Sequence, residues 1–131
     1  MKNLVYGFKY IASYHLLKKF TPLILGLTIT NKCNLKCRHC KIETRGKKNI
    51  GYDEARTAID SFYNEGGRTI YIQGGEPFIW HDGKYGLDDI VDYSHQRGFY
   101  TSIIYTNGTI PITTSADTVF ISMDGLQKHL S

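Results

Sequence analysis

Residues 23–40 decide the fold and read LILGLTITNKCNLKCRHC. Leu23 to Thr30 form a continuous apolar and β-branched run, which is typical of a strand covered on both faces. Cys33, Cys37 and Cys40 follow in a polar and basic loop, with three and then two residues between them. The stretch therefore predicts a first strand that carries three thiols in the loop at its carboxyl end.

The three cysteines favour a metal over disulfides. They lie within eight residues and cannot all pair, which suits a metal site in a reducing compartment. A structural zinc site is normally closed by four ligands, whereas a cubane iron-sulfur cluster on three thiolates leaves one iron open. Zinc with His39 or a more distant histidine as the fourth ligand is the alternative metal. Three cysteines packed as small hydrophobic side chains are less favoured, because the loop is polar.

The rest of the chain alternates between helices and strands. We expect helices over 53–65, with Asp53 as the N-cap, and over 86–97, and strands over 68–73, 100–106 and 118–124. Only about ten residues separate the last two strands, so a loop should replace the helix there. This order predicts an α/β fold with a parallel sheet and right-handed crossovers, in which chemistry gathers at the carboxyl ends of the strands.

Polar motifs follow the later strands. Gly74-Gly75-Glu76-Pro77 follows the second strand, where the glycines would let the backbone approach a ligand and adopt positive φ, and Pro77 fixes the exit. An ordinary glycine turn with a solvated Glu76 is the alternative. Thr106-Asn107-Gly108 and Ser122-Met123-Asp124-Gly125 end the next two strands. Polar residues that only cap their own turns would explain these two motifs nearly as well as residues that contact a ligand.

The paired motifs resemble the radical S-adenosylmethionine (radical SAM) superfamily. The Cys-x3-Cys-x2-Cys loop and the Gly-Gly-Glu-Pro turn occur in the family's order, and the resemblance spans roughly residues 23–125. It implies a parallel-stranded partial (β/α) barrel of TIM-like type, preceded here by an N-terminal helix and truncated after about four strands. At about 30 residues per β/α unit, the family's six units need about 180 residues. We therefore expect a truncated gene product or a fragment with an exposed sheet edge.

The resemblance also implies two cofactors and the residues that bind them. A 4Fe-4S cluster would be held by Cys33, Cys37 and Cys40, and its fourth iron would chelate the amino and carboxylate groups of S-adenosylmethionine. The implied cofactor-binding residues are Gly74, Gly75, Glu76, Pro77, His39, Ser122 and Asp124. Gly74 to Pro77 would receive the methionine ammonium, mainly through backbone carbonyls. His39 replaces the aromatic residue usual in the family and can still pack against the adenine.

We therefore predict an enzyme that reductively cleaves S-adenosylmethionine to a 5′-deoxyadenosyl radical, which abstracts a hydrogen atom from a substrate. The substrate is left open between a lipid and a peptide. A reducing electron donor such as flavodoxin or ferredoxin is the expected partner. The rival from another class is a non-catalytic module that carries zinc or an iron-sulfur cluster.

The N-terminal segment, residues 1–21, is expected to be an amphipathic helix ahead of an incomplete core domain at 22–131. Its helical part should cover residues 4–20, and one apolar arc is formed by Leu4, Val5, Phe8, Ile11, Ala12 and Leu16. Two roles stay open. The helix either covers the barrel or lies at a membrane surface, where Tyr6, Tyr10, Tyr14 and the lysines would suit an interface.

Composition excludes other classes of protein. The chain has 131 residues and 41% hydrophobic residues, which suits one modest globular domain rather than a disordered segment. Its formal net charge of +4 is too mild to indicate nucleic-acid binding. Lys9, His15, Lys18 and Lys19 interrupt residues 2–20, which therefore lack a secretory core and a membrane span. We expect a cytoplasmic protein.

Overall fold

The computed structural model describes residues 2–17, 21–46 and 48–123. Its elements, in chain order, are α1 (Lys2–Leu17), β1 (Ile24–Thr30), the 3-10 turn η1 (Ile42–Arg45), α2 (Tyr52–Asn64), β2 (Thr69–Gly74), the 3-10 turn η2 (Pro77–Ile79), β3 (His81–Asp82), β4 (Tyr85–Gly86), α3 (Leu87–Arg97), β5 (Thr101–Thr106) and β6 (Thr118–Ile121).

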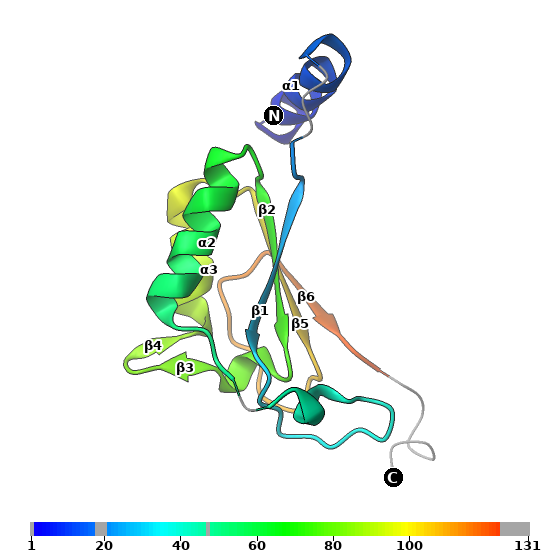
Figure 1. The fold of residues 1–131 in the computed structure, drawn as a ribbon, viewed down its shortest axis with the longest axis vertical. Helices are drawn as coiled ribbons and strands as arrows, with labels where there is room; N and C mark the ends of the chain where they lie inside the picture. Colours follow the sequence, from blue (N-terminus) through cyan, green and yellow to red (C-terminus); the bar gives the residue numbers. More distant parts are fainter. Residues whose placement is uncertain (1, 18–20, 47, 124–131) are drawn as a thin grey trace.

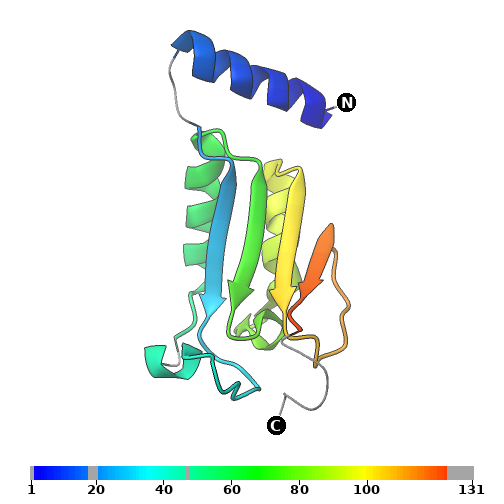
Figure 2. The ribbon, with the colours of Figure 1, turned by 90° about the vertical axis from the view of Figure 1, so that its right-hand side faces the viewer.

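The long strands form one parallel sheet in the order β1-β2-β5-β6, so each successive strand is added at the same edge. Helices α2 and α3 lie together on one face of this sheet (Figures 1 and 2). The segment between β5 and β6 contains no helix, as the short connection predicted. The predicted α/β fold is confirmed, with a leading helix and four parallel strands that are consistent with part of a TIM-like barrel.

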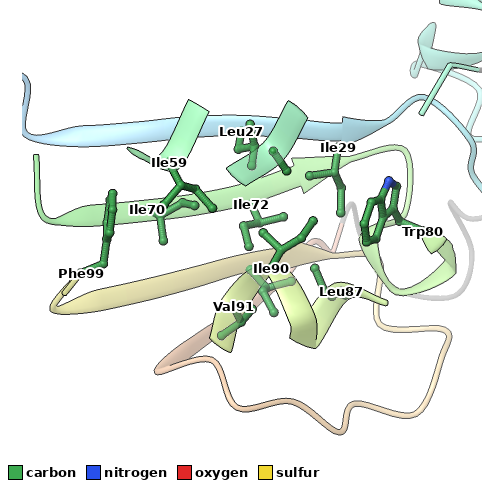
Figure 3. Packing of buried hydrophobic residues seen from close by; sticks show 12 residues of the cluster. Leu27, Ile29, Ile59, Ile70, Ile72, Trp80, Leu87, Ile90, Val91 and Phe99 are labelled. Carbon is green, nitrogen blue, oxygen red and sulfur yellow. The ribbon is translucent and has the colours of Figure 1, made fainter. Parts of the chain in front are cut away.

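The hydrophobic core lies between this sheet and the two helices (Figure 3). Ile70 and Ile72 of β2 meet Ile59 of α2 and Ile90 of α3, and all four side chains are fully buried. Buried residues recur with a period of two on β2 and of four on α2, where Ala55 and Ile59 are buried, as amphipathic elements require. The core therefore supports the sheet from one side.

The prediction that β1 is covered on both faces is wrong. Leu27 and Ile29 are buried in the core, but Ile24 is 55% exposed on the opposite face. That face carries an aromatic row, in which the rings of Tyr71 and Tyr105 lie 5.5 Å apart and those of Tyr105 and Phe120 lie 5.1 Å apart. An apolar run is consistent with burial on one face as well as on two, so the sequence of β1 does not separate these cases.

Several predicted element ends also shift. Helix α2 has Gly51 as its N-cap rather than Asp53, which lies in the first turn, and the Asp82 carboxylate from β3 accepts the Tyr52 N–H at 2.7 Å. A capping group 30 residues away is invisible to local sequence rules. The predicted strand over 118–124 ends at Ile121, and the predicted helix over 4–20 is described as far as Leu17.

Helix α1 lies across the amino ends of the strands, away from the core (Figure 2). The Tyr6 hydroxyl donates to the Gly66 carbonyl at 2.8 Å. The rings of Tyr6 and Tyr100 pack in a T-shaped arrangement with their centroids 5.7 Å apart. Neither α1 nor any other described helix is both long enough and apolar enough to cross a bilayer. The boundary between an N-terminal segment at 1–21 and a core domain at 22–131 remains a prediction.

Candidate functional site

The predicted functional motifs gather at one edge of the sheet. Strands β1, β2, β5 and β6 run in the same direction, so the segments that follow them meet at their carboxyl ends. These segments are the cysteine loop at 31–48, the turn at 74–77, the turn at 106–109 and Ser122. Figure 1 shows this edge opposite the one that α1 crosses.

The Gly-Gly-Glu-Pro turn is tied to the start of the cysteine loop. The Gly75 N–H donates to the Thr30 carbonyl at 2.8 Å, and the Glu76 N–H donates to the Lys32 carbonyl at 2.9 Å. A Cβ atom at Gly74 would overlap the Thr30 carbonyl oxygen, and one at Gly75 would overlap the Lys32 carbonyl. These glycines are therefore required by the close approach of two protein backbones.

The expected positive φ at these glycines is wrong. Positive φ occurs at Gly46, Gly66, Gly83, Gly98 and Gly108 among the described glycines, and not at positions 74 or 75. The missing side chains make room for the backbone of residues 30–33 rather than for an unusual turn. The sequence therefore indicated correctly that these positions need glycine. The physical reason is the close protein backbone and not a positive φ.

Glu76 is fully buried and braces the turns after β2 and β5. Its carboxylate accepts the Phe78 N–H at 3.1 Å, the Thr106 hydroxyl at 2.8 and 2.9 Å, and the Asn107 N–H at 2.8 Å. A carboxylate is a strong acceptor, and donors from both turns converge on its two oxygens. Glu76 therefore supports the geometry of the turn, and Pro77 begins η2 directly behind it.

Asn107 is a site residue to which sequence reasoning assigned no role. Its side-chain amide donates to the side-chain Oδ1 of Asn34 at 2.9 Å and to Cys33 Sγ at 3.7 Å. Cys33 Sγ also accepts the Leu35 N–H at 3.4 Å. The available signal was the Thr-Asn-Gly sequence at a strand end, because an amide there can reach the other loops at the carboxyl ends of the strands; here it reaches across β2 to the loop after β1. Asn107 thus links the Glu76 brace to the first cysteine.

The cysteine loop carries three sulfur atoms that could bind a metal or a cluster. Cys33 and Cys37 are partly buried and Cys40 is exposed, and all three are free thiols. The Cys40 N–H donates to the Cys37 carbonyl at 3.0 Å, which closes a turn between these two cysteines. Within the described residues, no three His, Cys, Asp or Glu side chains converge closely enough to hold a metal ion. Binding would require the thiols to converge.

The chemistry of this loop fits an iron-sulfur cluster. Three sulfur ligands suit iron-sulfur chemistry, and four basic residues in the same loop, at 32, 36, 38 and 41, would balance the negative charge of thiolates and cluster. A hollow of about 400 Å³ adjoins the loop and is lined by Asn31, Lys32, Cys33, Leu35, Lys36, Ile42 and Ile79. This space lies on the side of the loop that faces η2.

The remaining predicted residues are less closely assembled. His39 lies exposed in the cysteine loop, between the second and third cysteines. Ser122 is exposed just after β6, where its N–H donates to the Thr106 carbonyl at 2.8 Å. Asp124 lies outside the described residues. The roles of these three residues in cofactor binding remain predictions.

The class of this protein is defined by an α/β fold with a parallel sheet. A three-cysteine loop follows the first strand of that sheet, and a glycine-rich turn follows the second. The sequence model of the Radical SAM superfamily matches residues 27–126. The chain therefore belongs to the radical SAM superfamily.

Curated relatives carry different functional names. The chain is similar to Fe-coproporphyrin III synthase of Methanosarcina barkeri, with 31% identity over 63% of this chain and 20% of that protein. It is 30% identical to the antilisterial bacteriocin subtilosin biosynthesis protein AlbA of Bacillus subtilis, over 68% of this chain and 19% of that protein. A probable GTP 3',8-cyclase of Methanococcus maripaludis is 34% identical over 64% of this chain and 28% of that protein. The chain thus spans between 19% and 28% of the length of these relatives.

Proposed function

We propose that this chain holds a 4Fe-4S cluster on Cys33, Cys37 and Cys40 and cleaves S-adenosylmethionine reductively. The observation that carries the proposal is the hydrogen-bonded junction between the cysteine loop and the Gly-Gly-Glu-Pro turn. It brings the two motifs to one edge of the sheet, where a ligand bound to the loop would also meet the turn. When bound, the reduced cluster supplies the electron that splits the sulfonium into methionine and a 5′-deoxyadenosyl radical.

The residues of this chain would bind and orient the cofactors. The turn at 74–77 would receive the methionine ammonium through backbone carbonyl groups, because its Gly75 and Glu76 N–H groups already donate to the backbone at residues 30 and 32. The Glu76 and Pro77 carbonyls already accept the Ile79 and Trp80 N–H groups, so each would offer only its second lone pair. Glu76 would hold this turn at a fixed position relative to β5. Asn107 would donate a hydrogen bond to the sulfur of Cys33, and such bonds are one of the means by which proteins set cluster potentials.

Substrate, partners and location extend this proposal. The relatives' names refer to a porphyrin, a bacteriocin and a nucleotide, so they do not select one substrate class for this chain. We keep a lipid or a peptide as the proposed substrate. We also keep a flavodoxin or ferredoxin as the electron donor, and the cytoplasm as the site of action.

The test is anaerobic reconstitution with iron and sulfide, followed by EPR of the dithionite-reduced protein with and without S-adenosylmethionine. We expect about four irons and four sulfides per chain and a cubane signal that shifts when the cofactor is added. Cys37→Ala should lose the cluster, whereas Lys36→Ala in the same loop should keep it.

Other outcomes would contradict parts of the proposal. A bound zinc ion without sulfide would reject the cluster. A cluster whose signal ignores S-adenosylmethionine, in a protein that forms no 5′-deoxyadenosine, would instead identify a non-catalytic carrier.

A further inference from the structure

Helix α1 meets the rest of the protein through the side opposite its apolar arc. Tyr6 contacts Gly66 and Tyr100, and Tyr10 on the same side of α1 is partly buried. The apolar arc points away from the sheet instead. A helix that only covered a core would turn its apolar arc inward, so this orientation is the reverse of the usual one.

The exposed arc runs along the helix and is interrupted by one polar residue, the exposed His15. Its large members are all exposed: Leu4, Val5, Phe8, Ile11 and Leu16. Phe8, in the middle, is 71% exposed and Leu16, near the end, is 81% exposed. Scattered apolar residues on a surface are ordinary, but a stripe of this kind marks an interaction surface.

The charge of the N-terminal segment favours an anionic partner. Residues 1–20 contain four lysines and no Asp or Glu, and the first acidic residue of the chain is Glu43. Residues 43–131 contain twelve acidic residues against eight Lys and Arg, so the positive excess lies in residues 1–42, where four basic residues belong to the N-terminal segment and four to the cysteine loop. Lys9 is exposed and lies at the border of the apolar arc by helical geometry.

We propose that α1 docks flat on an anionic lipid surface, with Leu4, Phe8 and Ile11 inserted among the acyl chains and Lys9 at the headgroup phosphates. An apolar face with flanking lysines and no acidic residue is the pattern of helices that lie in the membrane interface. A second copy of the chain fits less well, because a symmetric pairing of two α1 helices would bring lysines together without any acidic residue in residues 1–42 to pair with them.

This orientation separates the lipid surface from the cysteine loop. Strand β1 has seven residues and runs from the α1 end to the cysteine end, a length of about 23 Å at ~3.3 Å per residue. Figure 2 shows α1 and the cysteine loop at opposite ends of the sheet. The helix would therefore anchor the protein to the surface and would not itself deliver a lipid to the cysteine loop. The inference is independent of the proposed cluster chemistry.

The test is flotation of the full chain with phosphatidylcholine vesicles that contain roughly one third phosphatidylglycerol, compared with pure phosphatidylcholine vesicles. We expect binding to the anionic vesicles and much weaker binding to the neutral ones. Ile11→Ser should weaken anionic binding about tenfold, because it removes one inserted side chain. Lys9→Gln should weaken it about fivefold on anionic vesicles only.

The matched control is Ile112→Ser, the same substitution at an exposed isoleucine in the loop before β6. This variant should bind vesicles like the unchanged protein. Ile11 is itself exposed, so its variant should keep the melting curve of the parent. The proposal is overturned if anionic vesicles do not bind the chain, or if I11S and I112S bind equally. A dimer that I11S dissociates, in a protein that ignores vesicles, would assign the arc to a second copy instead.

Discussion

Replacing Glu76 by glutamine tests whether this residue is a structural brace. The change keeps the shape of the side chain and replaces one acceptor oxygen by an NH2 donor. In E76Q, the remaining oxygen could still accept the Phe78 N–H and the Thr106 hydroxyl. The new NH2 group would then face the Asn107 N–H, which in the unchanged protein donates to the second carboxylate oxygen at 2.8 Å. Two donors would meet where a donor and an acceptor meet now.

The expected cost follows from these partners. An unsatisfied donor in a buried position costs about 1–3 kcal/mol, and hydrogen bonds to a charged group contribute about 1.5–3 kcal/mol. Because the remaining oxygen keeps part of the network, we expect E76Q to lose about 2–3 kcal/mol of unfolding free energy. For a domain of this size that corresponds to a fall in Tm of roughly 10 °C.

The assay is urea denaturation of the reduced, metal-free chain, followed by circular dichroism. Glu65→Gln is the matched control, because Glu65 is exposed at the end of α2 and the same change there should alter stability by less than about 0.5 kcal/mol. If E76Q and E65Q unfold at the same urea concentration, Glu76 does not brace the fold. A stable E76Q protein that loses S-adenosylmethionine binding would instead show that Glu76 acts on cofactor binding rather than on the stability of the fold.

Two further predictions concern glycines and pH. Gly75→Ala should destabilise the chain by on the order of 3 kcal/mol, because the new Cβ would overlap the Lys32 carbonyl. The control Gly7→Ala, with open space around it, should be neutral or gain up to about 1 kcal/mol of helix stability. Thermal melts of both variants check this prediction. Partial burial tends to raise the pKa of Asp117, but hydrogen bonds from the Ser102 N–H and hydroxyl, together with the hydrogen bond and charge of His95, outweigh it and hold this pKa below its usual value of 3.8. Its stabilising contribution is therefore present above pH 3.8 and is lost as the pH falls through the lowered pKa. Asp117→Asn should flatten that acid limb of a stability-against-pH curve, and an unchanged limb would contradict the assignment.

The sequence predicted the arrangement of strands and helices because its signals are local. Apolar runs mark β1, β2 and β5, and glycines bound the last two of these runs whereas Pro22 and Asn31 bound the first. Parallel topology then brings the motifs after these strands to one edge. The location of the site follows from topology alone. Contacts within the site could not be predicted in the same way, since Glu76 and Thr106 are 30 positions apart and Asn107 and Cys33 are 74 apart.

Helix α1 shows a second limit of sequence reasoning. Its periodicity correctly identified which residues share an arc, but periodicity does not tell which side of a helix meets the rest of the protein. The side of α1 that faces the protein carries Tyr6, whose hydroxyl donates to the Gly66 carbonyl, a contact between residues 60 positions apart. The same limit applies to β1, whose apolar run has one face in the core and one face open.

The ends of the cysteine loop are joined at the sheet. The Asn31 N–H donates to the Lys48 carbonyl at 2.8 Å, the Ile50 N–H donates to the Ile29 carbonyl at 3.0 Å, and Thr30 forms an isolated bridge with Asn49. The chain thus leaves and re-enters the sheet at one point, with the three cysteines in the closed segment between. The entropy of closing this segment is already lost on folding. Bringing the three cysteines together around a cluster would therefore only rearrange residues inside the closed segment. We therefore expect amide hydrogen exchange to change within residues 33–46 on cluster loading, and to stay constant in β1 and β2.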